Sequence, residues 1–219
     1  MKIEATILIL LACYSLMLVT VITFERLTAK NKFRSRDLRV LNYFHVLLIS
    51  LMLVTSCIIN AGYFLLYFPG KISVAQLAAF LVVFGVISFL PWKKFSNEVT
   101  VAQYLSRDPA SGIALYTFVR TGFLVIYEWF FRGLLLLSFS SWFGINWAIV
   151  INVFLYAVLH SHKSKKEILG CVPFGALMCV FTIWWQSVWP AIIFHVQLAM
   201  VNEWPFLQKS ISLQKQNAI

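Results

Sequence analysis

Seven long apolar runs, separated by short polar or basic segments, account for most of the chain. A membrane-spanning helix needs about 20 predominantly apolar residues, and most of these runs reach or approach that length. They are too long for the buried core helices of a soluble protein. We therefore expect an all-α fold, a polytopic membrane bundle of about seven transmembrane helices, formed by residues 3–24, 40–68, 72–92, 112–144, 145–159, 168–185 and 189–206.

The composition agrees with a membrane protein and excludes several other classes. Of the 219 residues, 61% are hydrophobic and 12% are charged, whereas soluble domains carry about 25% charged residues. A disordered chain, a secreted disulfide scaffold and an ordinary cytosolic enzyme are therefore excluded. The four cysteines each lie within an apolar run and form no CxxC pair. We interpret them as small buried hydrophobic residues rather than as metal ligands or disulfides.

The positive charge predicts how the helices are oriented. The net charge is +10, and most of the 18 Lys and Arg residues lie in segments 25–39, 93–111 and 163–167 and in the C-terminal tail. With an odd number of spans these segments all fall on one side of the membrane, as the positive-inside rule requires of cytoplasmic loops. We expect a multi-pass protein of the plasma (inner) membrane of a prokaryote, with its N-terminus outside and its C-terminus in the cytoplasm. Because the lipid bilayer explains the basic charge, no nucleic-acid partner is expected.

Three segments of the chain are expected to differ in role. The first run, residues 3–24, is too long for the core of a signal peptide and is expected to remain as a helix. Residues 1–111 then form an accessory layer of transmembrane helices and cytoplasmic loops. Residues 112–206 are the expected functional core, because most ionisable residues within apolar runs lie there. Residues 207–219 form a polar tail that we expect to be frayed.

Glu128, Arg132 and His195 are the most informative ionisable residues. A charged side chain in hydrocarbon costs at least about 2.5–3.5 kcal/mol on insertion scales, so it requires a role. Glu128 and Arg132 are four residues apart, in the order that favours an ion pair on one helix face. They are either a structural pair that neutralises itself or a catalytic carboxylate with its partner. His195 has apolar neighbours on both sides and is expected to be functional, because a buried His needs a partner for each ring nitrogen.

The other polar residues of these runs have simpler interpretations. His160 lies at the end of its run, four residues after Tyr156, where a His is typically interfacial. Arg120 is expected to snorkel to the cytoplasmic interface, His45 to have no special role and Glu203 to be hydrated. A proton-relay transporter is an alternative use of intramembrane Glu, Arg and His residues, but the chain has no visible repeat to support it.

Three motifs follow one another in the order found in a known family. They read YEWFFRG at 127–133, YAVLH at 156–160, and PFGAL at 173–177 continuing to WPAIIFH at 189–195. This order resembles the CPBP family of intramembrane proteases, also called the CAAX protease and bacteriocin-processing (Abi) family. The resemblance covers roughly residues 112–205 and implies a helical membrane fold.

The resemblance implies an intramembrane glutamate-dependent endopeptidase. In this family a Glu and a His activate a water molecule, which attacks a carbonyl of a membrane-associated peptide or protein tail. Glu128 would be the base, His160 would assist it, and His195 would donate to the oxyanion, a role with most effect in a dry site. Arg132 would position the base, with Tyr156 as a supporting residue. No cofactor is expected, although Glu128, His160 and His195 could also form a site for a divalent metal.

Two positions depart from the pattern of the family. The family usually carries two adjacent Glu residues, whereas this chain has Tyr127 before Glu128. Four residues after the last His the family has an Asn that stabilises the oxyanion, whereas this chain has Ala199. Asn202 lies about one turn further along roughly the same face and is the expected substitute. The alternative is a catalytically inactive CPBP-like protein that acts as an immunity factor, a chaperone or a regulator.

Overall fold

The structure, a computed structural model, describes residues 3–30, 38–59, 71–89 and 109–217. These residues are almost entirely helical, and no β-strand occurs among them. The all-α fold expected from the sequence is confirmed. In chain order the helices are α1 (Ile3–Lys30), α2 (Leu38–Ile58), α3 (Val74–Phe89), α4 (Pro109–Glu128), the π-helix η2 (Trp129–Leu135), α5 (Leu136–Phe143), α6 (Ile145–Leu159), α7 (Lys165–Trp185) and α8 (Trp189–Asn217).

Each of the seven apolar runs contains a helix, and the helices differ in length. α3 and α6 are apolar but shorter than a typical membrane span. The membrane bundle expected from the hydrophobic pattern therefore combines long spans with shorter apolar helices. Among the described residues, four segments are long and apolar enough to cross a membrane: Glu4–Leu27, Val40–Ile58, Gly112–Phe143 and Lys165–Trp185.

Some helix boundaries differ from the prediction. The second apolar run predicts a helix to Phe68, but α2 ends at Ile58, and residues 60–70 lie outside the described part of the chain. The fourth run is a continuous rod of α4, η2 and α5 that ends at Gly144, whose φ of 79° suits glycine. The helix α8 continues to Asn217, through the tail that we expect to be frayed from its polar composition.

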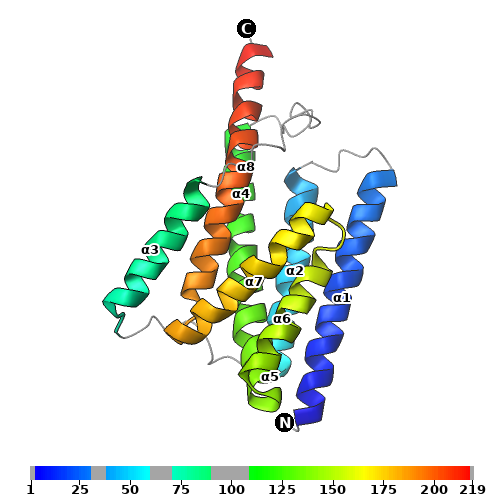
Figure 1. Cartoon of the computed structure of the whole chain (residues 1–219). Helices are drawn as coiled ribbons and strands as arrows, with labels where there is room; N and C mark the ends of the chain where they lie inside the picture. Colours follow the sequence, from blue (N-terminus) through cyan, green and yellow to red (C-terminus); the bar gives the residue numbers. More distant parts are fainter. Residues whose placement is uncertain (1–2, 31–37, 60–70, 90–108, 218–219) are drawn as a thin grey trace.

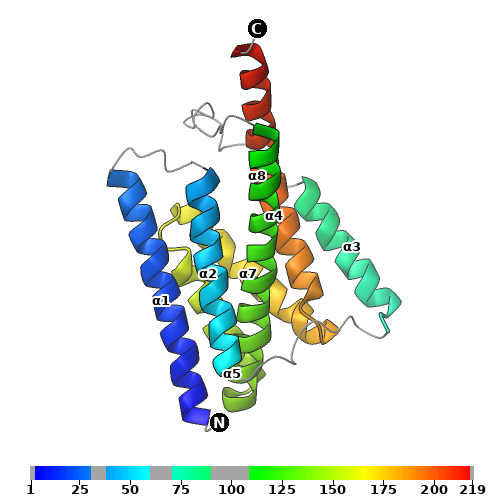
Figure 2. The same cartoon turned by 180° about the vertical axis from the view of Figure 1, so that it is seen from behind.

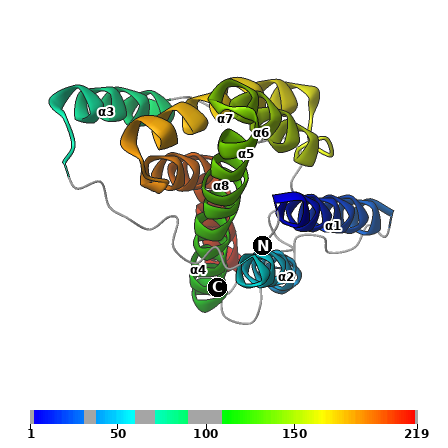
Figure 3. The same cartoon turned by 90° about the horizontal axis from the view of Figure 1, so that it is seen from below.

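The rod of α4, η2 and α5 runs through the middle of the bundle (Figure 1). Both α2 and α8 pack along α4, while α6 packs against α5 and α7, and α1 packs against α2. Seen from behind in Figure 2, α1 and α2 lie on one side of the rod and α3 on the other. The view from below in Figure 3 places α3 and α1 at opposite edges. The start of α1 and the end of α8 lie at opposite ends of the long axis (Figure 1).

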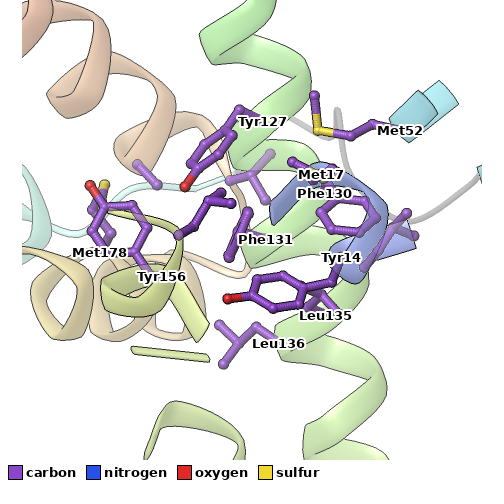
Figure 4. Packing of buried hydrophobic residues seen from close by; sticks show 14 of the residues in the cluster. Tyr14, Met17, Met52, Tyr127, Phe130, Phe131, Leu135, Leu136, Tyr156 and Met178 are labelled. Atoms are coloured by element: carbon purple, nitrogen blue, oxygen red, sulfur yellow. The ribbon is translucent and has the colours of Figure 1, made fainter. Parts of the chain in front are cut away.

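Large apolar side chains fill the space between the rod and the N-terminal helices. In Figure 4, Tyr14 and Met17 of α1 lie against Phe130 of the rod. The Tyr14 ring meets Phe131 edge-on, with centroids 6.4 Å apart, and its hydroxyl donates to the carbonyl oxygen of Leu155 at 2.8 Å. Lipid is as apolar as these side chains, so close packing and interhelical hydrogen bonds hold such helices together.

A polar cluster joins α2, α4 and α8 outside the apolar core. Arg120 donates to Glu203 Oε1 from Nε at 3.1 Å and from Nη2 at 3.0 Å. The hydroxyl of Tyr116 donates to the other oxygen of this carboxylate at 2.9 Å, and Nη1 of Arg120 lies 3.3 Å from Nε2 of His45. The Arg120 and Glu203 side chains are only 21% and 26% exposed. The sequence does not predict this ion pair, which adds to the expected interfacial positions of Arg120 and Glu203 and brings His45 next to Arg120.

We expect Arg120→Met to lower the free energy of unfolding by about 1–3 kcal/mol, because the partly buried carboxylate of Glu203 loses its charged partner. Reversible unfolding in detergent micelles measures this loss. Combining the change with Glu203→Gln is expected to cost less than the sum of the two single losses, because the second substitution removes the charge that the first leaves unpaired. Additive losses would contradict the coupling between α4 and α8.

Candidate active site

The rod changes its helical form directly after Glu128. Throughout η2 the backbone is π-helical, and the N–H of Leu136 donates to the carbonyl oxygen of Phe131. The same carbonyl accepts a second hydrogen bond, of 2.7 Å, from the side-chain amide of Asn152 on α6. Asn152 is completely buried, and its Oδ1 accepts from the thiol of Cys179 on α7 at 3.3 Å. Short π-helical turns are rare and are frequent at functional sites, and here side chains from two other helices support one.

Glu128 lies at the start of this turn, with Oε1 in hydrogen-bond contact and Oε2 in an ion pair. Arg132 places Nη1 3.1 Å from Oε2 and 3.4 Å from Oε1. His195 reaches across from α8, and its Nδ1 contacts Oε1 of the same carboxylate. The Glu128 and Arg132 side chains are completely buried, and that of His195 is 12% exposed. Because a buried carboxylate is tolerated only when it is paired, these contacts explain how Glu128 is accommodated in an apolar bundle.

The contact with Glu128 determines which ring nitrogen of His195 carries a proton. A carboxylate only accepts hydrogen bonds, so Nδ1 donates, and in the neutral ring Nε2 keeps its lone pair. Three aromatic rings meet the His195 ring edge-on. Their centroids lie 5.7 Å (Tyr127), 6.3 Å (Tyr156) and 5.9 Å (Phe174) from its own. These rings limit the access of water, and electrostatic interactions are stronger in such surroundings.

His160 lies just beyond the end of α6, next to Tyr156. Its Nδ1 is 2.9 Å from the backbone carbonyl oxygen of Tyr156. A carbonyl only accepts, so Nδ1 carries the proton and Nε2 of the neutral ring is an acceptor. Burial lowers the pKa of His160, and this effect outweighs the hydrogen bond to the carbonyl, which raises it. His160 is therefore neutral at pH 7.

Tyr156 connects the two histidines with Arg132. Its ring centroid lies 4.6 Å from the centre of the Arg132 guanidinium, a cation–π contact. Gly175 of α7 allows α7 to approach this pair closely. A Cβ atom at Gly175 would lie 3.1 Å from Cδ1 of Tyr156 and 3.6 Å from Nη2 of Arg132. The glycine of the PFGAL motif is therefore a packing requirement of the site.

Several polar atoms of the site have no hydrogen-bond partner among the described residues. They include the hydroxyl of Tyr127 and the Nε and Nη2 atoms of Arg132. Leaving a buried polar group without a hydrogen bond costs about 1–3 kcal/mol, so most such groups in folded proteins are paired. A developing negative charge is stabilised by hydrogen-bond donors that are held in place in a dry site.

The residues predicted to act together lie close to one another. Glu128, Arg132 and His195 are in direct contact. His160 is connected to them through Tyr156, whose ring centroid lies 4.6 Å from that of His160 and 6.3 Å from that of His195. The i,i+4 ion pair and the functional His expected from the sequence thus form one polar cluster between α4, α6 and α8.

Two positions considered for the oxyanion donor lie away from the polar cluster, and the sequence analysis did not predict one buried amide that supports the site. Asn202 donates from Nδ2 to the carbonyl oxygen of Leu198 at 2.8 Å, along its own helix, and Ala199 is buried in the apolar core. Within the described ranges, no group of three or more His, Cys, Asp and Glu side chains has the arrangement of a metal site. Asn152 was not predicted, and its only signal in the sequence is a single amide within an apolar run.

The comparisons with known proteins agree with the motif order. Residues 109–201 match the family model described as Rce1-like, type II CAAX prenyl endopeptidase Rce1-like. The match confirms the resemblance to the CPBP proteases and contains Glu128, Arg132, His160 and His195. Comparison with curated proteins gives no match, and comparison with solved structures gives none.

We expect Gly175→Ala to lower the free energy of unfolding by about 1–3 kcal/mol, because the new methyl group overpacks against the buried Tyr156 ring. Gly122→Ala in α4 is the matched control, since a Cβ atom there has nothing within 4 Å. The control is expected to be neutral or stabilising by up to about 1 kcal/mol, as for glycine replacement in an open helix position. Thermal unfolding of both variants in the same detergent measures the difference, and equal effects would contradict the close approach of α7.

Proposed function

We propose that the chain is an intramembrane glutamate-dependent endopeptidase, from the premise that residues 109–201 match the Rce1-like model of type II CAAX prenyl endopeptidases. The observation that carries the proposal is the contact of Glu128 with His195, a buried carboxylate and an imidazole from distant parts of the matched segment. Such a pair can move a proton to and from a reacting water molecule. The proposed substrate is a membrane-associated peptide or protein tail.

In the proposed reaction, Glu128 and His195 act together as the base. Nε2 of His195 takes a proton from water while the water oxygen bonds to the carbonyl carbon, and Glu128 stabilises the resulting imidazolium. The imidazolium then gives this proton to the amide nitrogen as the C–N bond breaks. Arg132 pairs with the carboxylate and orients it. His160 accepts a hydrogen bond from the attacking water through Nε2 and so orients it.

These roles differ in one respect from those that the family resemblance implies. The resemblance assigns the base to Glu128 alone and the oxyanion donor to His195. A neutral His195 that donates from Nδ1 to the carboxylate has no second N–H for an oxyanion. We therefore assign proton transfer to His195 and orientation and charge stabilisation to Glu128.

The proposal also includes the division of the chain into segments and its orientation in the membrane. Residues 112–206 form the proteolytic core, and residues 1–111 form an accessory layer of helices around it. The positive-inside rule favours basic segments that face the cytoplasm of a prokaryotic cell, with the N-terminus outside the plasma membrane. Residues 31–37 and 90–108 of these segments lie outside the described part of the chain. A metal-assisted form of the reaction, with a divalent ion at Glu128, His160 and His195, is a separate hypothesis, and inhibition by a chelator would support it.

A second candidate function is a non-catalytic member of the family, acting as an immunity factor, a chaperone or a regulator. It is favoured by Tyr127 and Ala199 at the positions where the family has Glu and Asn. The pairing of Glu128 with both Arg132 and His195 also suits a structural ion cluster. Under this alternative the buried charges stabilise the bundle and no peptide is cut.

Glu128→Gln separates the two candidate functions, because it keeps the size of the side chain and removes the carboxylate. We expect cleavage to fall about 10²–10⁴-fold, because His195 loses the carboxylate that orients it and stabilises its charged form, and general acid–base catalysis typically contributes this much. The measurement compares peptide termini in membranes of cells that carry equal amounts of wild type and variant. Glu203→Gln, which alters an ion-paired carboxylate outside the site, is the matched control and is expected to leave the termini unchanged. Identical termini for wild type and a folded, abundant Glu128→Gln variant would contradict the peptidase and favour the scaffold.

A further inference from the structure

Tyr127 stands beside the catalytic carboxylate, at the position where the CPBP pattern has a Glu. Its side chain is 3% exposed, and its hydroxyl has no hydrogen-bond partner in the described part of the chain. Folded proteins rarely keep a buried hydroxyl in this state, because it costs about 1–3 kcal/mol. Unpaired polar groups of this kind require an explanation, and a role in catalysis is one of the recognised explanations.

The surroundings of Tyr127 hold its ring in place and leave its hydroxyl available. The ring stacks on Phe131 with a centroid distance of 4.6 Å and meets His195 edge-on at 5.7 Å. In Figure 4 the hydroxyl points to the side of the core where Tyr156 lies, away from Tyr14. A rigid ring with a free O–H donor next to the base has the properties of a preorganised catalytic group.

The proposed reaction needs a hydrogen-bond donor for the oxyanion. In the family pattern an Asn supplies this donor. Ala199 occupies the position of the family Asn and has no side-chain donor. The expected substitute, Asn202, donates to the backbone of its own helix. The proton on Nδ1 of His195 is engaged by Glu128. Arg132 also has unpaired N–H groups, but its guanidinium is held by Glu128 and the Tyr156 ring, so the Tyr127 hydroxyl is the neutral donor of the site with an uncommitted proton.

We propose that Tyr127 is the oxyanion donor of this peptidase and that it replaces the missing Asn from a different helix. When the water oxygen bonds to the carbonyl carbon, the π electrons of the carbonyl move to its oxygen, and the Tyr127 hydroxyl donates a hydrogen bond to that oxyanion. The tyrosine keeps its proton throughout, and the proton of the water goes to His195. This assignment rests on the proposed function and adds a catalytic residue to it.

Tyr127→Phe tests the proposal, because it removes only the hydroxyl and keeps the ring contacts. The assay uses purified protein in phosphatidylcholine–phosphatidylglycerol vesicles and an internally quenched peptide, chosen from a randomised set because the wild type cleaves it. We expect kcat to fall about 10²–10³-fold, as on removal of one oxyanion donor, with KM nearly unchanged. The thermal midpoint is expected to stay the same or rise, because the hydroxyl has no partner to lose.

Tyr14→Phe is the matched control for a structural hydroxyl. Its hydroxyl donates to the Leu155 carbonyl, so its removal is expected to lower the thermal midpoint and leave kcat unchanged. The proposal is overturned if Tyr127→Phe retains wild-type kcat, or if its kcat and its midpoint fall together. If Glu128→Gln lowers kcat about 10²–10⁴-fold and Tyr127→Phe leaves it at the wild-type value, only the role of Tyr127 fails. If the wild type cleaves no peptide of the set, the proposed function fails and the assignment fails with it.

Discussion

One buried negative charge constrains the arrangement of the bundle. A carboxylate without a partner in the membrane interior is too costly to keep, and Glu128 is completely buried. Two partners reach it from different directions, Arg132 from one turn further along the rod and His195 from α8. The Arg132 guanidinium lies over the Tyr156 ring of α6, and Gly175 lets α7 approach both. The close contacts of α6, α7 and α8 with the rod are therefore linked to the pairing of this charge.

Features that depend on neighbouring residues could be predicted from the sequence, and features that depend on distant residues could not. The spacing of Glu128 and Arg132 predicts an ion pair, and the two side chains lie 3.1 Å apart. The π-helical form of η2 is not predictable locally, because the amide that supports it belongs to Asn152 on another helix. Arg120 and Glu203 are 83 residues apart, so no local window contains both, and each is expected by itself to reach water. The positions of the apolar helices, in contrast, follow from the lengths of the apolar runs.

The described conformation closes the site, which has consequences for both stability and catalysis. Glu128 is completely buried, Tyr127 is 3% exposed, and the 12% exposed His195 is the most accessible of the three. A closed, dry site strengthens hydrogen bonds to a developing charge, and donors kept unpaired there lower the stability of the resting protein. Such a trade-off between stability and activity would follow from the proposed catalytic function.

The most direct test of the account is a double-mutant cycle between Glu128 and His195 in the free energy of unfolding. Glu128→Gln, His195→Gln and the double variant are unfolded reversibly in one detergent, and the coupling energy is calculated from the three losses. If the buried carboxylate and the imidazole are paired, the coupling exceeds about 1.5 kcal/mol, as for close charge pairs in other proteins. Losses that add to within about 0.5 kcal/mol would show that the two side chains do not interact, and would contradict both the site and the mechanism built on it.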